Sequence, residues 1–413
     1  IFVVTKEVAP VGVVSNTITL SGKITKDTTL YAKDVNYLSG IIYVTKGVTL
    51  TIEAGAKVQG KSGADVAALV ICRGAKIVAK GTADAPIVFT SASLNPQSGD
   101  WGGIVLLGSA TVNQSLTWKG VAVKGLTSVE GGINDTEVGY GLAGSGDAAY
   151  PTANDADNSG ILQYVRIEYA GYAYQPDNEL NSLTMAGVGN GTTIDHIQVT
   201  YAKDDAYEWF GGTVNCKYLI AYKTQDDDFD TDFGYSGKVQ FGIVLRDSAI
   251  ADISKSEAFE SDNDGNGSDF TPKTTAVFSN ITAIGPRING TYGKGNTLFL
   301  AGAQIRRNSG ISIQNAVFAG WPLGILIDDT KVTTNGSTYK NLVDSVLRLK
   351  NITLAGNTVD VRYDGKTGTT VTSADISNIF ATASYGNTIL SSSSADILKL
   401  IQPFNYTNPD FTP

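Results

Sequence analysis

Short segments in which apolar and polar residues alternate recur along most of the chain, and each is followed by glycine, asparagine or aspartate. In the segment DHIQVTYA, apolar side chains occupy every second position, at Ile197, Val199 and Tyr201. A period of two is typical of β-strands. No run of helical period separates the segments, so we do not expect helices that connect parallel strands.

One phrase returns several times in the C-terminal half, at uneven intervals. Its copies are SNITAIG (279–285), QNAVFAG (314–320), KNITLAG (350–356) and SNIFATA (377–383). Uneven intervals are typical of a solenoid in which loops vary while strands stay in register. Asn-Gly pairs of the hairpin type, as at Asn190–Gly191, keep an antiparallel sandwich as an alternative. The pattern favours an all-β fold, a single right-handed parallel β-helix.

The chain divides into an entry or cap segment, the solenoid, and a C-terminal helix with a tail. We place these parts at 1–39, 40–390 and 391–413. The stretch 113–160 is rich in Gly, Ala, Ser and Asp and hardly alternates, so we expect a long loop excursion there. The segment SSSADILKLIQPF (392–404) is the clearest helix candidate, with Ser393 or Ser394 as its N-cap.

Composition and charge exclude some functions. The 413 residues carry a net charge of −9, which argues against nucleic acid and against docking on anionic lipid. No apolar run approaches the ~20 residues of a membrane-spanning helix. The only two cysteines, Cys72 and Cys216, lie in strand-like contexts, which favours two buried thiols over a disulfide.

Three acidic segments align with one another. They are DDAYEWF (204–210), DDDFDTD (226–232) and SEAFESD (256–262). Their shared register puts Tyr207, Phe229 and Phe259 in one column. Because strand side chains alternate between faces, we expect these three rings to stack inside the solenoid on successive coils.

The same register places carboxylates on the outer face of these coils. They are Glu208, Asp228, Asp230, Asp232, Glu260 and Asp262. Coils stack ~4.8 Å apart, and two unit charges near that separation repel by about 3 kcal/mol at an effective dielectric constant of ~20. A bound cation, raised pKa values or full solvation would offset the repulsion. Hard oxygen ligands at this spacing suit Ca²⁺, although we identify no EF-hand spacing. A solvated acidic strip is the alternative.

Two further sets of residues are candidates for binding. Asp155 and Asp157 form a second acidic cluster, which is either a Ca²⁺ site or a polar turn. Trp209, Phe233 and Tyr235 flank the acidic segments. If exposed, these rings would make a platform for sugars, and if buried they belong to the core.

A catalytic function is the alternative to a binding function. The only histidine, His196, excludes a histidine-based metal cluster. Glycoside hydrolysis needs just two suitably spaced carboxylic acids, which the acidic segments supply. A lyase would also need a base, for which Arg287, Arg306 and Arg307 are candidates. Pairing of these arginines with carboxylates is their structural alternative.

Several phrases resemble a known family. They include LTIEAGAKVQGK, GDWGGIVLLG, YVRIEYAG, DDAYEWFGGTVN and DDDFDTDFGYSGKVQFG. This set is similar to the secreted or cell-surface right-handed parallel β-helix proteins common in Bacteroidetes, from about residue 40 to 330. The resemblance implies a pectate-lyase-like fold and an extracellular or cell-surface, outer-membrane-associated location. Most members lack an assigned activity, so no catalytic residues carry over.

We therefore expect a non-catalytic extracellular or cell-surface β-helix protein, stabilised by Ca²⁺. Its role would be structural, in an assembly, or in binding a glycan or surface protein. Other copies of the chain or an outer-membrane complex are possible partners. The alternative is a polysaccharide lyase or glycoside hydrolase that uses the acidic strip.

Overall fold

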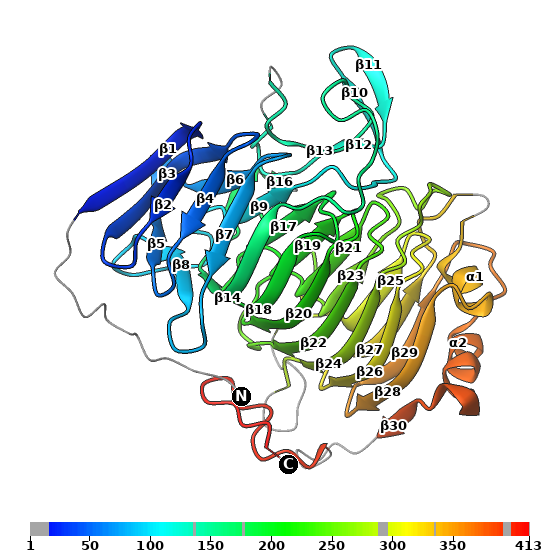
Figure 1. Cartoon of the computed structure of the whole chain (residues 1–413). Helices are drawn as coiled ribbons and strands as arrows, with labels where there is room; N and C mark the ends of the chain where they lie inside the picture. The colour runs from blue at the N-terminus through cyan, green and yellow to red at the C-terminus, as the bar shows by residue number, and fades with distance from the viewer. Residues whose placement is uncertain are drawn as a thin grey trace. The chain divides into compact units, whose positions relative to one another are not determined.

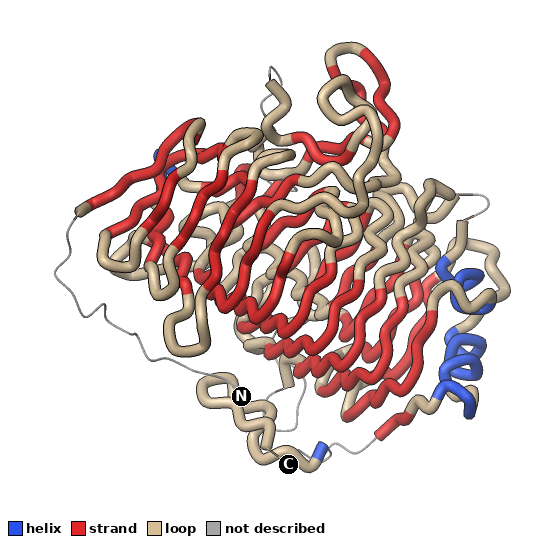
Figure 2. Tube along the Cα trace, viewed as in Figure 1, coloured by secondary structure: helices blue, strands red, loops and turns tan. Residues whose placement is uncertain are grey.

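The computed structural model describes residues 16–134, 138–175, 178–287, 296–333, 336–390 and 398–412. Nearly all its regular structure is β-strand, and strands pair in parallel with strands one coil away (Figures 1 and 2). The chain is thus a parallel β-helix, and the predicted fold class is confirmed. It consists of two compact units, residues 1–206 with 212–216 and residues 207–211 with 217–413.

The first unit begins the solenoid at β1. Its parallel strands are β1 (Thr17–Ile24), β2 (Thr28–Leu30), β3 (Val35–Val44), β4 (Thr49–Ile52), β5 (Lys57–Gly60), β6 (Ala68–Ile71), β7 (Lys76–Lys80), β8 (Ile87–Ser91), β9 (Ile104–Leu107), β14 (Gly160–Glu168), β17 (Leu183–Ala186) and β18 (Thr193–Thr200). In one coil β4, β5 and β6 follow each other, and in the next β7, β8 and β9 lie against them in the same order. Because β1 pairs with β3, the solenoid starts before the expected boundary at residue 40.

The stretch 113–160 contains antiparallel pairs instead of solenoid strands. They are β10 (Ser115–Trp118) with β11 (Val121–Lys124), and β12 (Leu126–Ser128) with β13 (Leu142–Gly144). The β10–β11 hairpin projects from the stacked strands (Figure 1). Near the end of the stretch, the Lys46 ammonium and the Arg73 guanidinium both lie within 4.6 Å of the centre of the Tyr150 ring. The Arg73 guanidinium also pairs with Asp147 at 2.6 Å, which fixes the returning chain. A third hairpin joins β15 (Ala173–Gln175) to β16 (Asn178–Glu179).

The turn of the β10–β11 hairpin should be the first site of tryptic cleavage within the described residues. Lys119 and Gly120 both have positive φ, 50° and 80°, and both are exposed. A two-stranded hairpin is only marginally stable alone and opens readily. Mass spectrometry of early digestion products should show cleavage after Lys119, and Lys119→Gln should abolish it. First cleavage inside a solenoid strand would contradict this prediction.

The second unit is also built of stacked parallel strands. Its strands are most of β20 (Asn215–Tyr222), β19 (Tyr207–Phe210), β21 (Phe229–Asp232), β22 (Lys238–Leu245), β23 (Phe259–Ser261), β24 (Val277–Ile284), β25 (Ala301–Arg306), β26 (Ser312–Ala319), β27 (Leu323–Asp328), β28 (Arg348–Ala355), β29 (Val359–Asp364) and β30 (Thr388–Leu390). The odd-numbered strands from β19 to β29 form one parallel ladder. The even-numbered strands from β22 to β30 form another.

Helices are short and lie elsewhere than expected. The described helices are α1 (Thr338–Val343) and α2 (Ser373–Phe380), with 3₁₀ turns at Gly63–Asp65 and Ala383–Tyr385. Within the expected helix at 392–404, residues 392–397 lie outside the described residues, and 398–404 contains no α-helix. Helix α2 begins with a capping box of Thr372 and Asp375, a signal that the sequence contains. No helix among the described residues is long and apolar enough to cross a membrane.

The core of the second unit contains the expected aromatic column. Strand pairing aligns Tyr207 with Phe229 and Phe229 with Phe259, at ring-centroid distances of 5.7 and 5.0 Å. All three rings are fully buried, so the predicted register is confirmed. Cys72 and Cys216 are both buried and are not joined in a disulfide, as their contexts indicated.

Candidate functional site

Carboxylates form a column on the outer face of the second unit. Pairing of β19, β21 and β23 aligns Glu208 with Asp230 and Asp230 with Glu260, and β25 continues the column with Gln304. These are the strand positions between the inward rings. Glu208 is only 6% exposed, and Asp230 and Glu260 are half-buried. The acidic strip is therefore not fully solvated, and its charges need another form of compensation.

Two arginines supply part of that compensation. Arg306, the last residue of β25, forms ion pairs with Glu260 and Asp262, the latter at 2.9 Å. Arg307 approaches the second oxygen of Asp262 at 2.5 Å. Both arginines thus pair with carboxylates, which was the structural alternative to a role as catalytic base. The ion pairs add a fourth form of charge balance to the cation, the raised pKa values and the solvation considered for the strip.

Three carboxylates converge beside this column. One oxygen each from Asp227, Glu257 and Glu260 lies within 4.8 Å of the others. Asp227 and Glu257 are 5% and 2% exposed, and the Glu257 amide donates to Asp227 Oδ1 at 2.6 Å. Both residues precede a strand, where the alternation of side chains is broken by a bend. The aligned segments already place Asp227 and Glu257 at equivalent positions. The sequence did not predict that both side chains lie close to Glu260.

The pKa values of these carboxyl groups are shifted upward. Burial, with the neighbouring Glu260, raises the pKa of Glu257 to about 8. Burial also raises the pKa of Asp226 to about 7, with a further contribution from Asp252. The pKa values of Asp230 and Asp232 lie well above the usual range because of burial and adjacent carboxylates. The Glu257 carboxyl group therefore holds a proton near neutral pH unless a cation replaces it.

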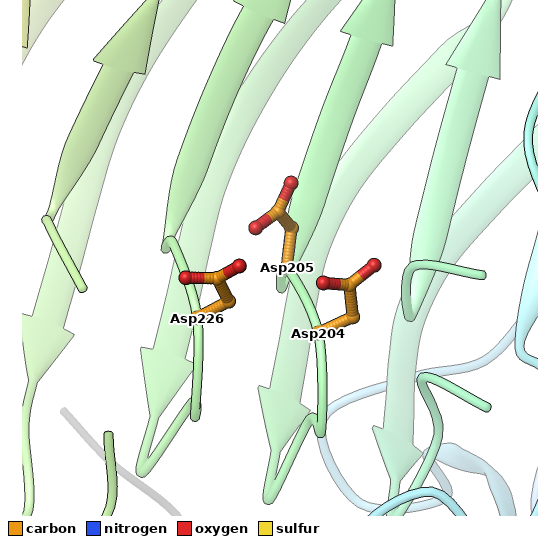
Figure 3. A group of neighbouring side chains, drawn as sticks. All are labelled: Asp204, Asp205 and Asp226. Carbon is orange, nitrogen blue, oxygen red and sulfur yellow. The ribbon is translucent and has the colours of Figure 1, made fainter. Parts of the chain in front are cut away.

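Other aspartates occupy equivalent places in the coils. Asp204 and Asp205 directly precede β19, as Asp226 and Asp227 stand before β21 (Figure 3 labels the first three). The Asp205 amide donates to Asn181 Oδ1 at 3.1 Å. Asp226 accepts a hydrogen bond from the Ser254 hydroxyl at 2.9 Å. Acidic pairs before a strand are thus a repeated feature of this part of the chain.

The sequence predicted that Asp228 points outward with the other carboxylates of the strip, and this prediction is wrong. Its side chain is fully buried, and Arg246 Nη1 lies 3.2 Å from its Oδ2. Arg246 and the Thr224 side chain are the polar groups beside the carboxylate, and both favour its ionised form. Burial raises the pKa of Asp228 to about 6, against the opposing effect of Arg246. The bend before β21 turns this side chain away from the outer face.

The second acidic cluster hydrogen-bonds to residues just before the excursion. Asp157 accepts a hydrogen bond from the Ser109 hydroxyl at 2.9 Å, and Asp155 accepts one from the Thr111 amide at 2.9 Å. Their carboxylates bind different neighbours and do not converge with a third acidic group among the described residues. These hydrogen bonds are those of a polar turn, and the Ca²⁺ site at Asp155 and Asp157 stays a prediction.

The proposed sugar platform is mostly core. Trp209 and Tyr235 are fully buried and stack on each other at 5.3 Å, so neither ring is available to a ligand. Phe233 is half-buried and packs against Phe210 at 5.1 Å. Trp209 shares its inward direction with Tyr207, two residues earlier in the same strand, and this alternation explains its burial.

One calcium-like spacing was overlooked in the sequence. Residues 262–267 read D-x-D-x-N-G, the first half of an EF-hand loop. The twelfth position is Lys273 instead of the usual glutamate. Asp264 accepts hydrogen bonds from the amides of Asn266 and Ser268, at 2.9 and 2.8 Å. Since Asp262 pairs with the two arginines described above, the loop is closed by the protein's own groups.

Comparison with known proteins agrees with this architecture. A family model described as a pectate-lyase-like β-helix domain matches residues 22–396. The chain belongs to this family. No curated protein matches it.

Solved structures add a distant likeness. The catalytic domain of a GH87 α-1,3-glucanase in complex with nigerose is 9% identical, with a TM-score of 0.24. A variant of that domain in complex with nigerose has a TM-score of 0.23, and another variant in complex with tetrasaccharides has a TM-score of 0.21. Each match covers 87% of this chain and 64% of the solved chain, so this chain spans less than two thirds of that length. A likeness of this degree carries no argument about activity.

Proposed function

We propose that this chain is a non-catalytic, carbohydrate-binding β-helix protein of the cell exterior that takes up Ca²⁺ at Asp227, Glu257 and Glu260. The observation that carries the proposal is the mutual distance of 4.8 Å or less between their oxygens. Ca²⁺ binds oxygen at roughly 2.3–2.6 Å, so two ligands of one ion lie at most about 5 Å apart. Three carboxylates at this spacing match that limit.

The same distance speaks against these groups as the pair of an inverting glycosidase. Catalytic carboxyl groups lie about 5–5.5 Å apart in retaining glycosidases and roughly 6.5–9.5 Å apart in inverting ones. The nearest oxygens of the cluster lie within 4.8 Å of one another, which is the closeness that a shared cation requires and is shorter than the spacing of an inverting pair. A lyase would need a free base, whereas Arg306 and Arg307 are engaged with Glu260 and Asp262. Binding is therefore the function that this geometry favours.

The outer face offers a suitable surface for sugars. Half-buried carboxyl groups at Asp230 and Asp232 present oxygens to hydroxyl groups, and Phe233 adds an apolar neighbour. A cation held by three carboxylates keeps coordination positions for water or sugar oxygens, since Ca²⁺ takes about 6–8 ligands. Extracellular Ca²⁺ modules work at weak affinities of roughly 10⁻⁴–10⁻³ M, which a site of this kind suits.

Ca²⁺ is expected to raise the melting temperature of the purified protein, and EDTA to lower it. An ion that binds only the folded chain stabilises it by mass action. Glu257→Gln should remove most of the Ca²⁺ effect, because it deletes a charged ligand but preserves shape. Asp344→Asn is the matched control, since its carboxylate is exposed and pairs with Lys340 outside the cluster. An unchanged melting temperature on chelation would refute the cation site.

The carbohydrate role has a separate test. Acidic and neutral polysaccharides should bind in calorimetry with Ca²⁺ present, and the binding should weaken in EDTA and in Glu257→Gln. The same samples should release no reducing ends and no unsaturated sugars. Release of either that is lost in Glu257→Gln would replace the binding function by the hydrolase or lyase alternative.

A further inference from the structure

An apolar stripe runs across the ends of four stacked strands in the second unit. Its members are Leu245, Ile284, Ala319 and Ala355, the last residues of β22, β24, β26 and β28. Alternation places the residue before each one, such as Ala283 in β24, toward the interior of the solenoid. The stripe should then face outward, yet Ile284, Ala319 and Ala355 are fully buried and Leu245 is 3% exposed.

The segment 398–412 covers this stripe. Four of its side chains, Leu398, Phe404, Tyr406 and Phe411, pack against it. Phe404 lies over Gly320, where an added Cβ would come within 2.7 Å of the ring and where φ is +77°. A side chain at this position would displace the ring, so the glycine makes room for Phe404.

Polar contacts fix the segment at one point. The Tyr406 hydroxyl donates to the Arg287 carbonyl oxygen, and the Tyr406 carbonyl oxygen accepts from the Tyr222 hydroxyl. The Arg287 guanidinium lies 5.6 Å from the centre of the Phe404 ring. Burial raises the pKa of Tyr406, as expected for a phenol enclosed between the segment and the β-helix. The apolar stripe and its polar neighbours are therefore suited to an aromatic side chain that ends in a polar group, such as tyrosine.

The backbone hydrogen bonds described for the segment all run within it. The Ile401 amide donates to Thr412, and the Gln402 and Asp410 amides exchange bonds with each other's carbonyl oxygens, at 2.9–3.1 Å. The segment is a small closed unit that contacts the solenoid through side chains and the Tyr406 carbonyl. A segment that is not covalently linked to the stripe could make the same contacts.

We propose that the apolar stripe is a docking site for the 398–412 segment as a separable module, which a second copy of the chain can also supply. Exchange of identical elements between copies is a low-cost route to dimers. Local opening has a smaller free energy than global unfolding where contacts are few. The site therefore links two copies without any new interface.

The test uses the full chain and a fluorescent peptide of residues 398–412. Tyr406→Ala in the chain weakens the docking of the chain's own segment on the stripe. The added peptide should therefore bind this variant roughly tenfold or more tighter than it binds the wild-type chain. Thr407→Ala, at an exposed position, is the control chain. A peptide carrying Phe404→Ala should lose binding. Equal anisotropy titrations of the wild-type and Tyr406→Ala chains, with native circular dichroism for both, would overturn the proposal.

Hydrogen exchange of the wild-type chain provides a second measurement that needs no variant. The amides of Ile401, Gln402 and Asp410 should exchange faster than those of β24 and β26, through opening of the segment alone. Excess unlabelled peptide should speed their exchange further by occupying the stripe. Exchange of these amides only together with the core strands would show that the segment is an inseparable part of the fold.

Discussion

Arg246→Met is expected to destabilise the folded chain, by about 1–2 kcal/mol near pH 7 and by more at higher pH, since each unit by which the pKa of Asp228 rises is worth about 1.4 kcal/mol. The guanidinium and the Asp228 carboxylate are both fully buried, with 3.2 Å between Nη1 and Oδ2. Removal of the positive charge leaves Asp228 in an apolar interior with no opposite charge. Urea denaturation of the wild type and the variant measures the loss. The variant also loses the contact of the guanidinium with the Phe299 ring, at 5.3 Å from its centre, and the hydrogen bond from Nη2 to the Gln225 carbonyl oxygen, at 3.1 Å.

Two controls separate charge from packing in this experiment. The pKa of Asp228 is raised to about 6 with Arg246 present, and removal of the arginine can only raise it further. The deficit of Arg246→Met should therefore shrink near pH 5, and adding Asp228→Asn should restore much of the stability at neutral pH. Arg362→Met breaks a more exposed pair with Asp364 and should cost at most about 1 kcal/mol. A pH-independent deficit would assign the loss to packing.

The register of the aromatic column could be predicted because it depends on short-range pattern. Alternation within a strand fixes which side chains face inward, and parallel coils repeat that choice. The aligned segments around Tyr207, Phe229 and Phe259 therefore predicted neighbours in space. The outward column of Glu208, Asp230 and Glu260 followed from the same rule.

The rest of the site could not be predicted by this rule. Asp227, Asp228 and Glu257 stand at bends, where side-chain direction is set by local backbone geometry instead of alternation. Their partners come from other coils, as Arg246 does for Asp228. Whether a bend turns a carboxylate inward or outward depends on such partners, and one sequence does not contain that information. The burial of Trp209 did follow from alternation, and it was left open only because aromatic residues also occur on sugar-binding surfaces.

In EDTA, the stability of the protein is expected to fall as the pH rises from about 5 to about 9. The folded-state pKa of Glu257 is about 8 against an ordinary 4.5, and that of Asp226 is about 7 against 3.8. Between these values the folded chain binds more protons than the unfolded chain, so stability falls with pH. This contribution is complete below the ordinary pKa values and is lost as the pH passes through about 7 to 8.

Ca²⁺ should reverse this loss, and the size of its effect should itself depend on pH. The ion binds deprotonated carboxylates, so it competes with protons for Asp227, Glu257 and Glu260. The increase in melting temperature should be small near pH 5 and largest near pH 8, where protons no longer offset the repulsion among these groups. Glu257→Gln cannot ionise, so it should flatten the fall between pH 6 and 8 in EDTA and also reduce the Ca²⁺ effect. A Ca²⁺ effect that is equal at both pH values would place the ion elsewhere on the protein. An unchanged pH slope in Glu257→Gln would show that this carboxyl group is not the proton-binding member of the cluster.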